Sequence, residues 1–119
     1  MVCRRSFWAF SRGSFWCDQL TIFRPWLAAW LAEHHLSVEQ IGSWAIHPGG
    51  PKILAACAQA AGLSRDQLWA SEQVLSRYGN MSSATVLFVL DLLRRQSSPR
   101  PCVALAFGPG LAIEAALWA

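Results

Sequence analysis

The spacing of apolar residues changes several times along the chain, and each change predicts a different element. Residues 26–35 place apolar side chains at helical spacing, and Pro25 suits a first turn, so we expect a helix that ends near Leu36. Residues 42–46 form a short apolar run that ends at a proline and two glycines, which cannot continue a strand. We therefore expect a buried strand followed by a tight turn.

Helical patterns occupy the middle of the chain. Residues 51–61 begin with a proline and are followed by a glycine, the order that helix ends prefer. In residues 64–78, Ser64 and Gln67 have the spacing of a capping box, which favours one or two helical turns. Residues 81–95 contain β-branched residues that favour a strand, but their length without a breaker favours a helix.

Two short apolar runs occupy the C-terminal part. Residues 102–107 and 111–118 predict two strands joined by a tight loop at 108–110. The order of helix, strand, three helices and two strands predicts an α/β fold with helices packed on a sheet. Residues 1–22 have no clean period and differ in character from the rest of the chain.

Composition makes one domain the starting assumption, because 119 residues can bury a single core. Apolar residues make up 54% of the chain, more than a small soluble domain needs for its interior, so some of this surface should meet a partner. Apolar runs such as residues 84–90 are much shorter than the roughly 20 residues of a membrane-spanning helix. Arg12 and Gly13 interrupt the N-terminal apolar run before a signal-peptide core can form, so we expect a cytoplasmic protein without membrane association.

Charge and metal-ligand usage exclude several classes of function. The formal net charge is only +3 and the arginines are scattered, which argues against nucleic-acid binding. The cysteines form no CxxC pair, so free thiols are expected rather than a zinc site or a disulfide framework. His34 and His35 have no third ligand at suitable spacing, and we expect no metal. The four cysteines are Cys3, Cys17, Cys57 and Cys102.

Several conspicuous side chains are expected to be structural. Trp44, Trp69 and Phe88 suit the core better than a substrate contact. Cys57 follows two alanines within an expected helix and suits a small buried residue rather than a nucleophile.

Two polar residues lie where one element ends and the next begins, and they are the candidate catalytic residues. His47 directly follows the expected buried strand, at the kind of strand end where open α/β sheets bind ligands. Asn80 precedes an expected helix, so a helix cap is its structural alternative. If the two side chains converge, their donors can hold the oxygen of a thioester carbonyl as negative charge develops, at roughly 3 kcal/mol per donor. Such a site needs a nucleophile, and a cysteine held as thiolate by a nearby histidine suits it.

Three motifs surround these residues in the order WAIHPGGPKIL, YGNMSSATVLFVLD and FGPGL. They resemble the C-terminal half of type III polyketide synthases, the chalcone and stilbene synthase family, over residues 24–119. The resemblance implies a thiolase-like α/β fold, here an incomplete C-terminal half with helices on a mixed sheet. It also implies a homodimer that condenses malonyl-CoA units onto an acyl-CoA starter through a Cys, His and Asn set. CoA thioesters would be substrates, and no cofactor is implied.

The resemblance further implies roles for individual residues. His47 and Asn80 would be the catalytic His and Asn that bind the thioester oxygen during malonyl decarboxylation and condensation. Gly49 and Gly50 would lie beside the pantetheine arm, and Ser82 would line the polyketide pocket. The loop residues that would line the same pocket are Phe107, Gly108, Pro109 and Gly110.

The chain departs from the family pattern in its N-terminal part. The family's catalytic cysteine belongs to the N-terminal half, and none of the four cysteines here has a matching context, so this chain alone should be inactive. Residues 1–22 do not resemble the family segment expected there, and we interpret them as a frame-shifted or disordered segment ahead of the C-terminal domain.

Two alternatives stay open. An initiating ketoacyl-ACP synthase of fatty-acid synthesis shares the fold and the catalytic set, but its His is typically followed by Gln-Ala-Asn and its Asn by Thr-Ser. This chain has Pro-Gly-Gly at 48–50 and Met-Ser-Ser at 81–83, which favours the polyketide branch. The second alternative is a non-catalytic partner or remnant, which pairs with a complete synthase or with a separately encoded N-terminal half.

Overall fold

A computed structural model describes residues 2–8, 17–108 and 112–119, with side chains described for 22–106 and 113–119. The elements in chain order are β1 (Val2–Trp8), α1 (Cys17–Glu33), the 3-10 turn η1 (Val38–Gln40), β2 (Ser43–Ile46), α2 (Pro51–Ala61), the 3-10 turn η2 (Arg65–Leu68), α3 (Trp69–Tyr78), α4 (Ala84–Arg95), β3 (Cys102–Gly108) and β4 (Ala112–Trp118).

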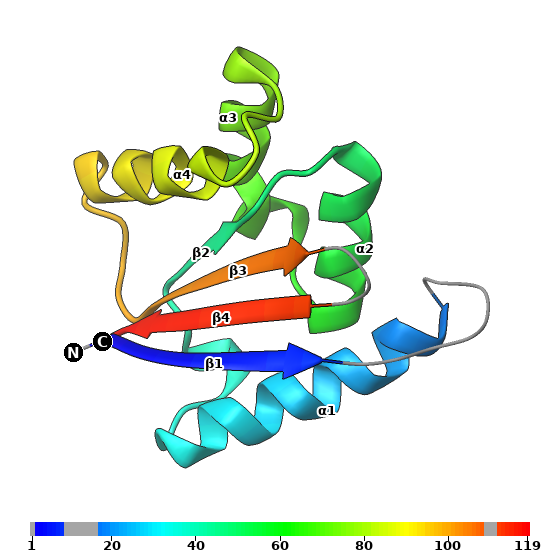
Figure 1. Cartoon of the computed structure of the whole chain (residues 1–119). Helices are drawn as coiled ribbons and strands as arrows, with labels where there is room; N and C mark the ends of the chain where they lie inside the picture. Colours follow the sequence, from blue (N-terminus) through cyan, green and yellow to red (C-terminus); the bar gives the residue numbers. More distant parts are fainter. Residues whose placement is uncertain (1, 9–16, 109–111) are drawn as a thin grey trace.

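The strands form one mixed sheet in the order β1-β4-β3-β2 (Figure 1). β2 and β3 are parallel, with Ile46 opposite Leu105, whereas β4 is antiparallel to both β3 and β1. This arrangement confirms the α/β class with helices packed on a mixed sheet. It also makes β2 an edge strand of the sheet.

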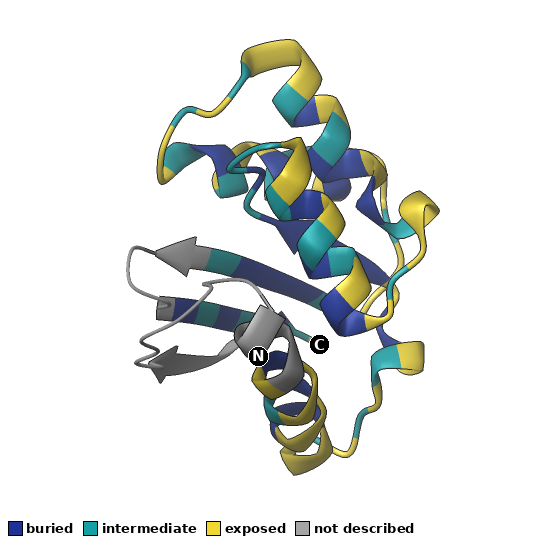
Figure 2. Ribbon diagram, turned by 90° about the vertical axis from the view of Figure 1, so that its right-hand side faces the viewer, coloured by how far each residue is buried: buried dark blue, intermediate teal, exposed yellow. Residues whose placement is uncertain are grey.

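Helices cover both faces of the sheet, and the alternation of side chains along β2 divides the core in two. Trp44 and Ile46 belong to the cluster that β3 and β4 share with α1, α2 and η2. Ala45 belongs to the cluster on the opposite face, with Val74 of α3 and Val89 of α4. Figure 2 shows the buried residues concentrated where these layers meet. Because all four residues of β2 are buried, the strand is held from both sides.

The N-terminal part differs from the sequence-based expectation. α1 runs from Cys17 to Glu33 and contains Pro25 in its interior, whereas we expected Pro25 in a first turn. The helix continues because Phe23, Leu27 and Trp30 follow one another on a single buried face, on both sides of the proline. β1 was also missed, because its partner is the distant strand β4 and the local sequence carries no clean alternation.

The start and end of α2 and the start of η2 have the expected residues. α2 starts at Pro51 and ends before Gly62, whose backbone is left-handed with φ of 71°. Ser64 donates its backbone N–H to Oε1 of Gln67 at 2.8 Å, as a capping box requires. The proline start, the glycine stop and the capping box are therefore confirmed.

α4 begins at Ala84, three residues later than expected, because local hydrogen bonds hold the preceding residues in a turn. Thr85 is fully buried, and its Oγ1 accepts from the backbone N–H of Met81 and donates to the carbonyl of Ser82, both at 2.8 Å. Ser82 has a left-handed backbone with φ of 60°. A polar side chain that bonds the backbone in this way competes with the helix and delays its start.

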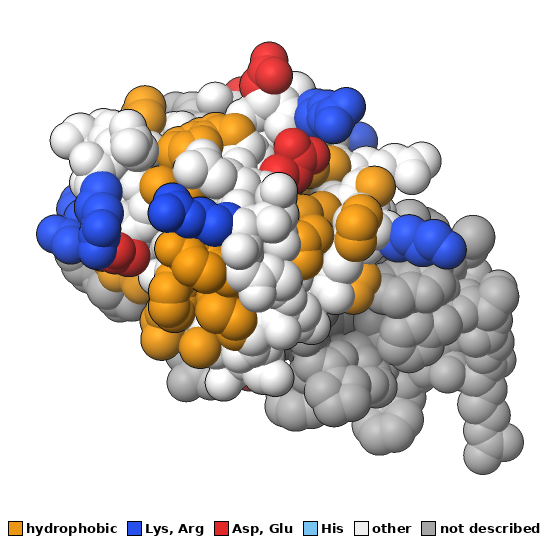
Figure 3. Space-filling model, turned by 90° about the horizontal axis from the view of Figure 1, so that it is seen from above, with side chains coloured by type: hydrophobic (Ala, Val, Ile, Leu, Met, Phe, Trp, Pro, Cys, Tyr) orange, Lys and Arg blue, Asp and Glu red, His pale blue; other side chains and the backbone are white. Residues whose placement is uncertain are grey.

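The surface over α3 and α4 carries exposed apolar side chains, some of which we expected in the core. Trp44 is buried as expected, but Trp69 and Phe88 are 37% and 44% exposed, so that part of the expectation is wrong. Leu87, next to Phe88 in α4, is 63% exposed. Figure 3 views this face and shows hydrophobic side chains open to solvent between charged ones. Among the described residues, no helix has the length and apolar character needed to cross a membrane.

Candidate active site

His47 lies at the carboxyl end of β2, beside the middle of the parallel strand β3. Its backbone N–H donates to the carbonyl of Leu105 at 2.8 Å, so the pairing of the two strands continues one residue past Ile46. The backbone of Phe107 and Gly108 continues β3 at this end of the sheet. Ligands of open α/β sheets bind at such strand ends. Pro109 and Gly110 lie outside the described residues.

The imidazole of His47 is partly buried. This burial lowers its pKa from the ordinary value, because the charged form loses hydration. Pro48, the next residue, is fully buried and anchors the turn. A histidine held neutral in this way keeps one N–H donor and one basic nitrogen, which are the two functions that acid–base work requires.

Gly49 and Gly50 occupy different environments although they are neighbours. A Cβ on Gly49 would lie 2.8 Å from Cδ1 of Ile53 and 4.0 Å from Nε2 of His47. A Cβ on Gly50 would meet nothing within 4 Å. Gly50 is the N-cap of α2, and its carbonyl accepts from Leu54 N–H at 3.1 Å. Gly49 is therefore the glycine whose missing side chain keeps space beside the imidazole.

Asn80 reaches across to the turn that carries His47. Its Nδ2 donates to the carbonyl of Gly49 at 3.4 Å, and its Oδ1 accepts from the backbone N–H of Ser82 at 2.9 Å. The second bond fixes the amide so that its NH₂ group faces the turn. Asn80 is thus not an ordinary N-cap of α4, whose N-cap is Ser83.

The structure brings the two candidate segments together from elements far apart in the sequence. The carboxyl end of β2 supplies His47, and the turn before α4 supplies Asn80, which contacts Gly49 two residues beyond the histidine. An amide NH₂ has two donors, and only one of them can serve the Gly49 carbonyl. The other donor and the imidazole suit a ligand oxygen with developing negative charge. The catalytic roles of His47 and Asn80 and the lining roles of Gly49, Gly50 and Ser82 stay predictions.

Burial disfavours the thiolate form of the two cysteines whose side chains are described. Burial raises the pKa of the Cys57 thiol to about 12, so it is protonated at neutral pH. Burial also raises the pKa of Cys102, which starts β3 and pairs with Ser43, at the end of β2 opposite to His47. Both are free thiols, as expected. The side chains of Cys3 and Cys17 lie outside the described residues.

No group of three or more possible metal ligands occurs within the part of the chain whose side chains are described. His34 stands edge-on to the ring of Trp30, with 6.0 Å between ring centroids, and His35 is exposed. His34 is therefore a packing residue, and His35 is solvated.

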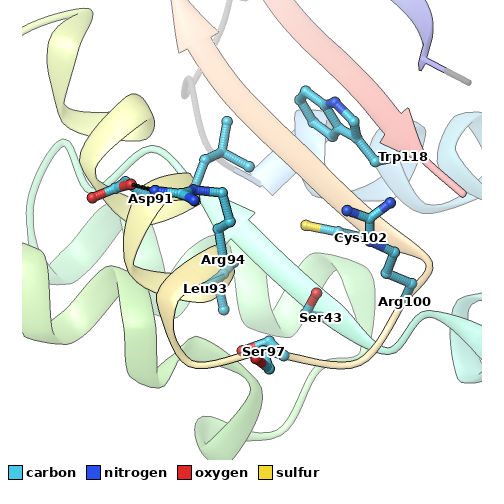
Figure 4. Close-up of a pocket in the computed structure, with 10 residues that line it drawn as sticks. Ser43, Asp91, Leu93, Arg94, Ser97, Arg100, Cys102 and Trp118 are labelled. Atoms are coloured by element: carbon cyan, nitrogen blue, oxygen red, sulfur yellow. Dashed lines mark hydrogen bonds and ion pairs between the residues drawn. The ribbon is translucent and has the colours of Figure 1, made fainter.

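A separate cavity of about 690 Å³ lies at the opposite end of β2 (Figure 4). Its lining includes Ser43, Arg94, Arg100, Cys102 and Trp118. Ser43 is about 10 Å from Ile46 along a strand with normal rise. This cavity is therefore not part of the His47 site.

Ser71 was not predicted from the sequence. Among the described residues, it is the one whose side chain bonds the backbone of β2 beside the site. Its hydroxyl is fully buried and contacts Ile46 at two points. A serine on the same helix face as buried Ala70 and Val74 was the available signal, because a buried hydroxyl needs a hydrogen-bond partner.

Known proteins resemble this chain in both sequence and fold. The family model for the chalcone and stilbene synthases, C-terminal domain, matches residues 35–119. The type III polyketide synthase pspB of Penicillium soppii is 53% identical over 74 residues, which cover 62% of this chain and 19% of that protein. The alpha-pyrone synthesis polyketide synthase-like Pks18 of Mycobacterium tuberculosis is 38% identical over 98 residues, which cover 79% of this chain and 25% of that protein.

A solved structure shares the fold over most of the chain. It is the crystal structure of PKS-I from the brown alga Ectocarpus siliculosus, with a TM-score of 0.79 and 28% identity. The match covers 87% of this chain and 30% of that one. The chain thus spans about a quarter of the length of the synthases it is similar to.

Proposed function

Because the chain belongs to the chalcone and stilbene synthase family, with residues 35–119 as its C-terminal domain, we propose that His47 and Asn80 belong to a Cys, His and Asn acyl-transfer site. In this proposal the chain contributes two members of the set to a type III polyketide synthase, which condenses malonyl-CoA units decarboxylatively onto an acyl-CoA starter.

The hydrogen bond between Asn80 and Gly49 is the observation that carries the proposal. It joins the asparagine motif to the histidine motif, so both side chains can serve one thioester. When a malonyl thioester loses carbon dioxide, its carbonyl oxygen gains the negative charge of an enolate. Two donors aimed at that oxygen stabilise the transition state more than the ground state, which is the condition for catalysis.

The nucleophilic cysteine has to come from outside the described part of this chain. Cys57 is protonated, and Cys102 pairs with Ser43, at the end of β2 opposite to His47. In the proposal an N-terminal half supplies the cysteine, whether it is continuous with these residues or a separate polypeptide. We therefore expect the 119 residues alone to form no covalent acyl intermediate.

Condensation of malonyl-CoA with an acyl-CoA starter tests this proposal, because this step needs the nucleophilic cysteine as well as the two donors. The purified chain is assayed alone and after mixing with the N-terminal portion of the Penicillium soppii relative, and formation of the condensation product is measured. We expect no turnover from the chain alone and turnover from the mixture. His47→Ala or Asn80→Ala should each lower the turnover of the mixture by about a hundredfold, the usual cost of one oxyanion donor.

Two outcomes would contradict the proposal. Turnover by the purified chain alone would show that it contains its own nucleophile. Unchanged turnover in the His47→Ala and Asn80→Ala mixtures would remove both residues from the site. If a mixture forms a stable complex without turnover, the exposed apolar surface at Leu87 and Phe88 favours a non-catalytic partner instead.

A further inference from the structure

Ile46 presents its backbone polar groups at the open edge of the sheet. Neighbouring residues of a strand point their N–H and C=O groups to opposite sides. His47 donates its N–H to Leu105 of β3, so the N–H and C=O of Ile46 point away from β3. β2 has no strand on that side within the described sheet. Because Ile46 is fully buried, water does not satisfy these groups, and another partner is required.

The hydroxyl of Ser71 is that partner. Its Oγ accepts from the Ile46 N–H at 3.1 Å and donates to the Ile46 carbonyl at 2.7 Å. One side chain thus replaces both bonds that a neighbouring strand would make with Ile46. Ser71 is 0% exposed, so its hydroxyl competes with no solvent and holds a single geometry.

Ser71 also belongs to the helix that leads to Asn80. α3 ends at Tyr78, and Gly79 and Asn80 come directly after it. Gly79 has φ of 71°, and its N–H donates to the carbonyl of Leu75 at 2.9 Å, so the chain leaves α3 in a defined direction. A helix is rigid over this length. A contact at Ser71 therefore sets the position of Asn80 as well as that of the strand end.

We propose that Ser71 is a positioning residue, which fixes the relative placement of His47 and Asn80 by bonding the backbone of Ile46 from the helix that carries Asn80. The inference rests on the proposed function, because it concerns the geometry of the same site. Ser71 itself touches no substrate in this account. It acts on the histidine through the adjacent peptide and on the asparagine through α3.

The test uses the isotopically labelled chain and nuclear magnetic resonance. In the unmodified protein the Ile46 amide should exchange slowly with solvent. In Ser71→Ala its exchange should accelerate about tenfold beyond the change of other buried amides, which corresponds to one lost hydrogen bond. The ring signals of His47 and the side-chain amide signals of Asn80 should both shift, and Ser71→Thr, which keeps the hydroxyl, should restore them.

Val74→Ala is the matched control, because Val74 is also buried on α3 but contacts the apolar cluster instead of Ile46. It should lower Tm without moving the His47 and Asn80 signals. Equal shifts in Ser71→Ala and Val74→Ala would overturn the inference, since a loosened α3 would then explain both. Fast exchange of Ile46 in the unmodified chain would also overturn it, and this measurement stands even if Ser71→Ala fails to fold.

These readouts need no catalytic turnover, so a failed reconstitution leaves them interpretable. In an active mixture, Ser71→Ala should lower kcat more than it changes KM, because misplaced donors weaken transition-state binding. Full activity of Ser71→Ala would overturn the positioning role and leave the roles proposed for His47 and Asn80 intact.

Discussion

At the scale of single residues, the position of His47 follows from local sequence, but its environment depends on distant contacts. A histidine between a buried strand and a proline is recognisable in the sequence, and the strand end is where it was expected. The hydrogen bond from Asn80 to Gly49 was not predictable, because a helix cap was an equally good local use of that side chain. The role of Ser71 was not predictable either, because its hydrogen-bond partner belongs to another element.

The lowered pKa of His47 predicts how stability depends on pH. Unfolding returns the imidazole to water and raises its pKa to about 6.5, so the unfolded chain binds more protons just below this pH. The free energy of unfolding should therefore fall as the pH drops through about 6.5. Urea denaturation between about pH 5 and 8 measures this slope, and His47→Gln should reduce it. A control at the exposed His35, His35→Gln, should keep it; an unchanged slope in His47→Gln contradicts the assignment.

Gly49 and Gly50 form a matched pair for testing the space beside the imidazole. Gly49→Ala places a methyl group 2.8 Å from Cδ1 of Ile53, so Ile53 must move, and the methyl also lies near His47. We expect shifted His47 ring signals and a loss of about 1 kcal/mol in the free energy of unfolding. Gly50→Ala has open space and an extended backbone, so its free energy of unfolding should change by less than about 1 kcal/mol. Identical behaviour of the two variants in denaturation and resonance measurements would contradict the difference between their environments.

At the scale of elements, the sequence predicted those whose signals are local. α2 has its proline start and glycine stop, and β2, β3 and β4 appear as apolar runs between breakers. The exposed face of α4 was not predictable, because residues 84–90 are almost all apolar and the pattern does not select one side. β1 depends on pairing with β4 at the other end of the chain, which no local pattern records.

The delayed start of α4 is tested at Thr85. Thr85→Val keeps the shape of the side chain but removes the hydroxyl that bonds Met81 and Ser82. Those two backbone groups then lose their partner, and we expect a loss of about 1–3 kcal/mol in urea denaturation. Thr85→Ser retains the hydroxyl and should preserve most of this contribution. If valine is as stable as threonine, the turn before α4 does not depend on these bonds.

At the scale of the whole molecule, the two faces of the sheet are covered by apolar packing to different degrees. The cluster with α1 and α2 contains most of the large buried side chains, including Trp30 and Trp44. The side with α3 and α4 has a smaller cluster and the exposed residues Leu87 and Phe88. The excess of apolar residues in the composition is therefore partly at the surface.

Leu87 and Val89 test this asymmetry on one helix. Leu87→Gln replaces a side chain that is 63% exposed, so Tm should change little and solubility should rise. Val89→Gln buries an amide at a position that is 0% exposed, and it should lower the free energy of unfolding by several kcal/mol or prevent folding. Thermal denaturation and light scattering distinguish the two. A large drop in Tm for Leu87→Gln would mean that this face of α4 is covered.

The parallel pairing of β2 with β3 has a consequence for the order of folding. β3 and β4 are neighbours in sequence and form a hairpin. Ile46 of β2 pairs with Leu105 of β3, and α2, α3 and α4 lie between these two residues in the sequence. Closing that long loop costs more chain entropy than closing the hairpin, and contacts of high sequence separation form slowly. We therefore expect the hairpin to acquire protection early in refolding and the backbone bond of His47 to appear late. The residue proposed for catalysis would then report the last step of folding rather than the first.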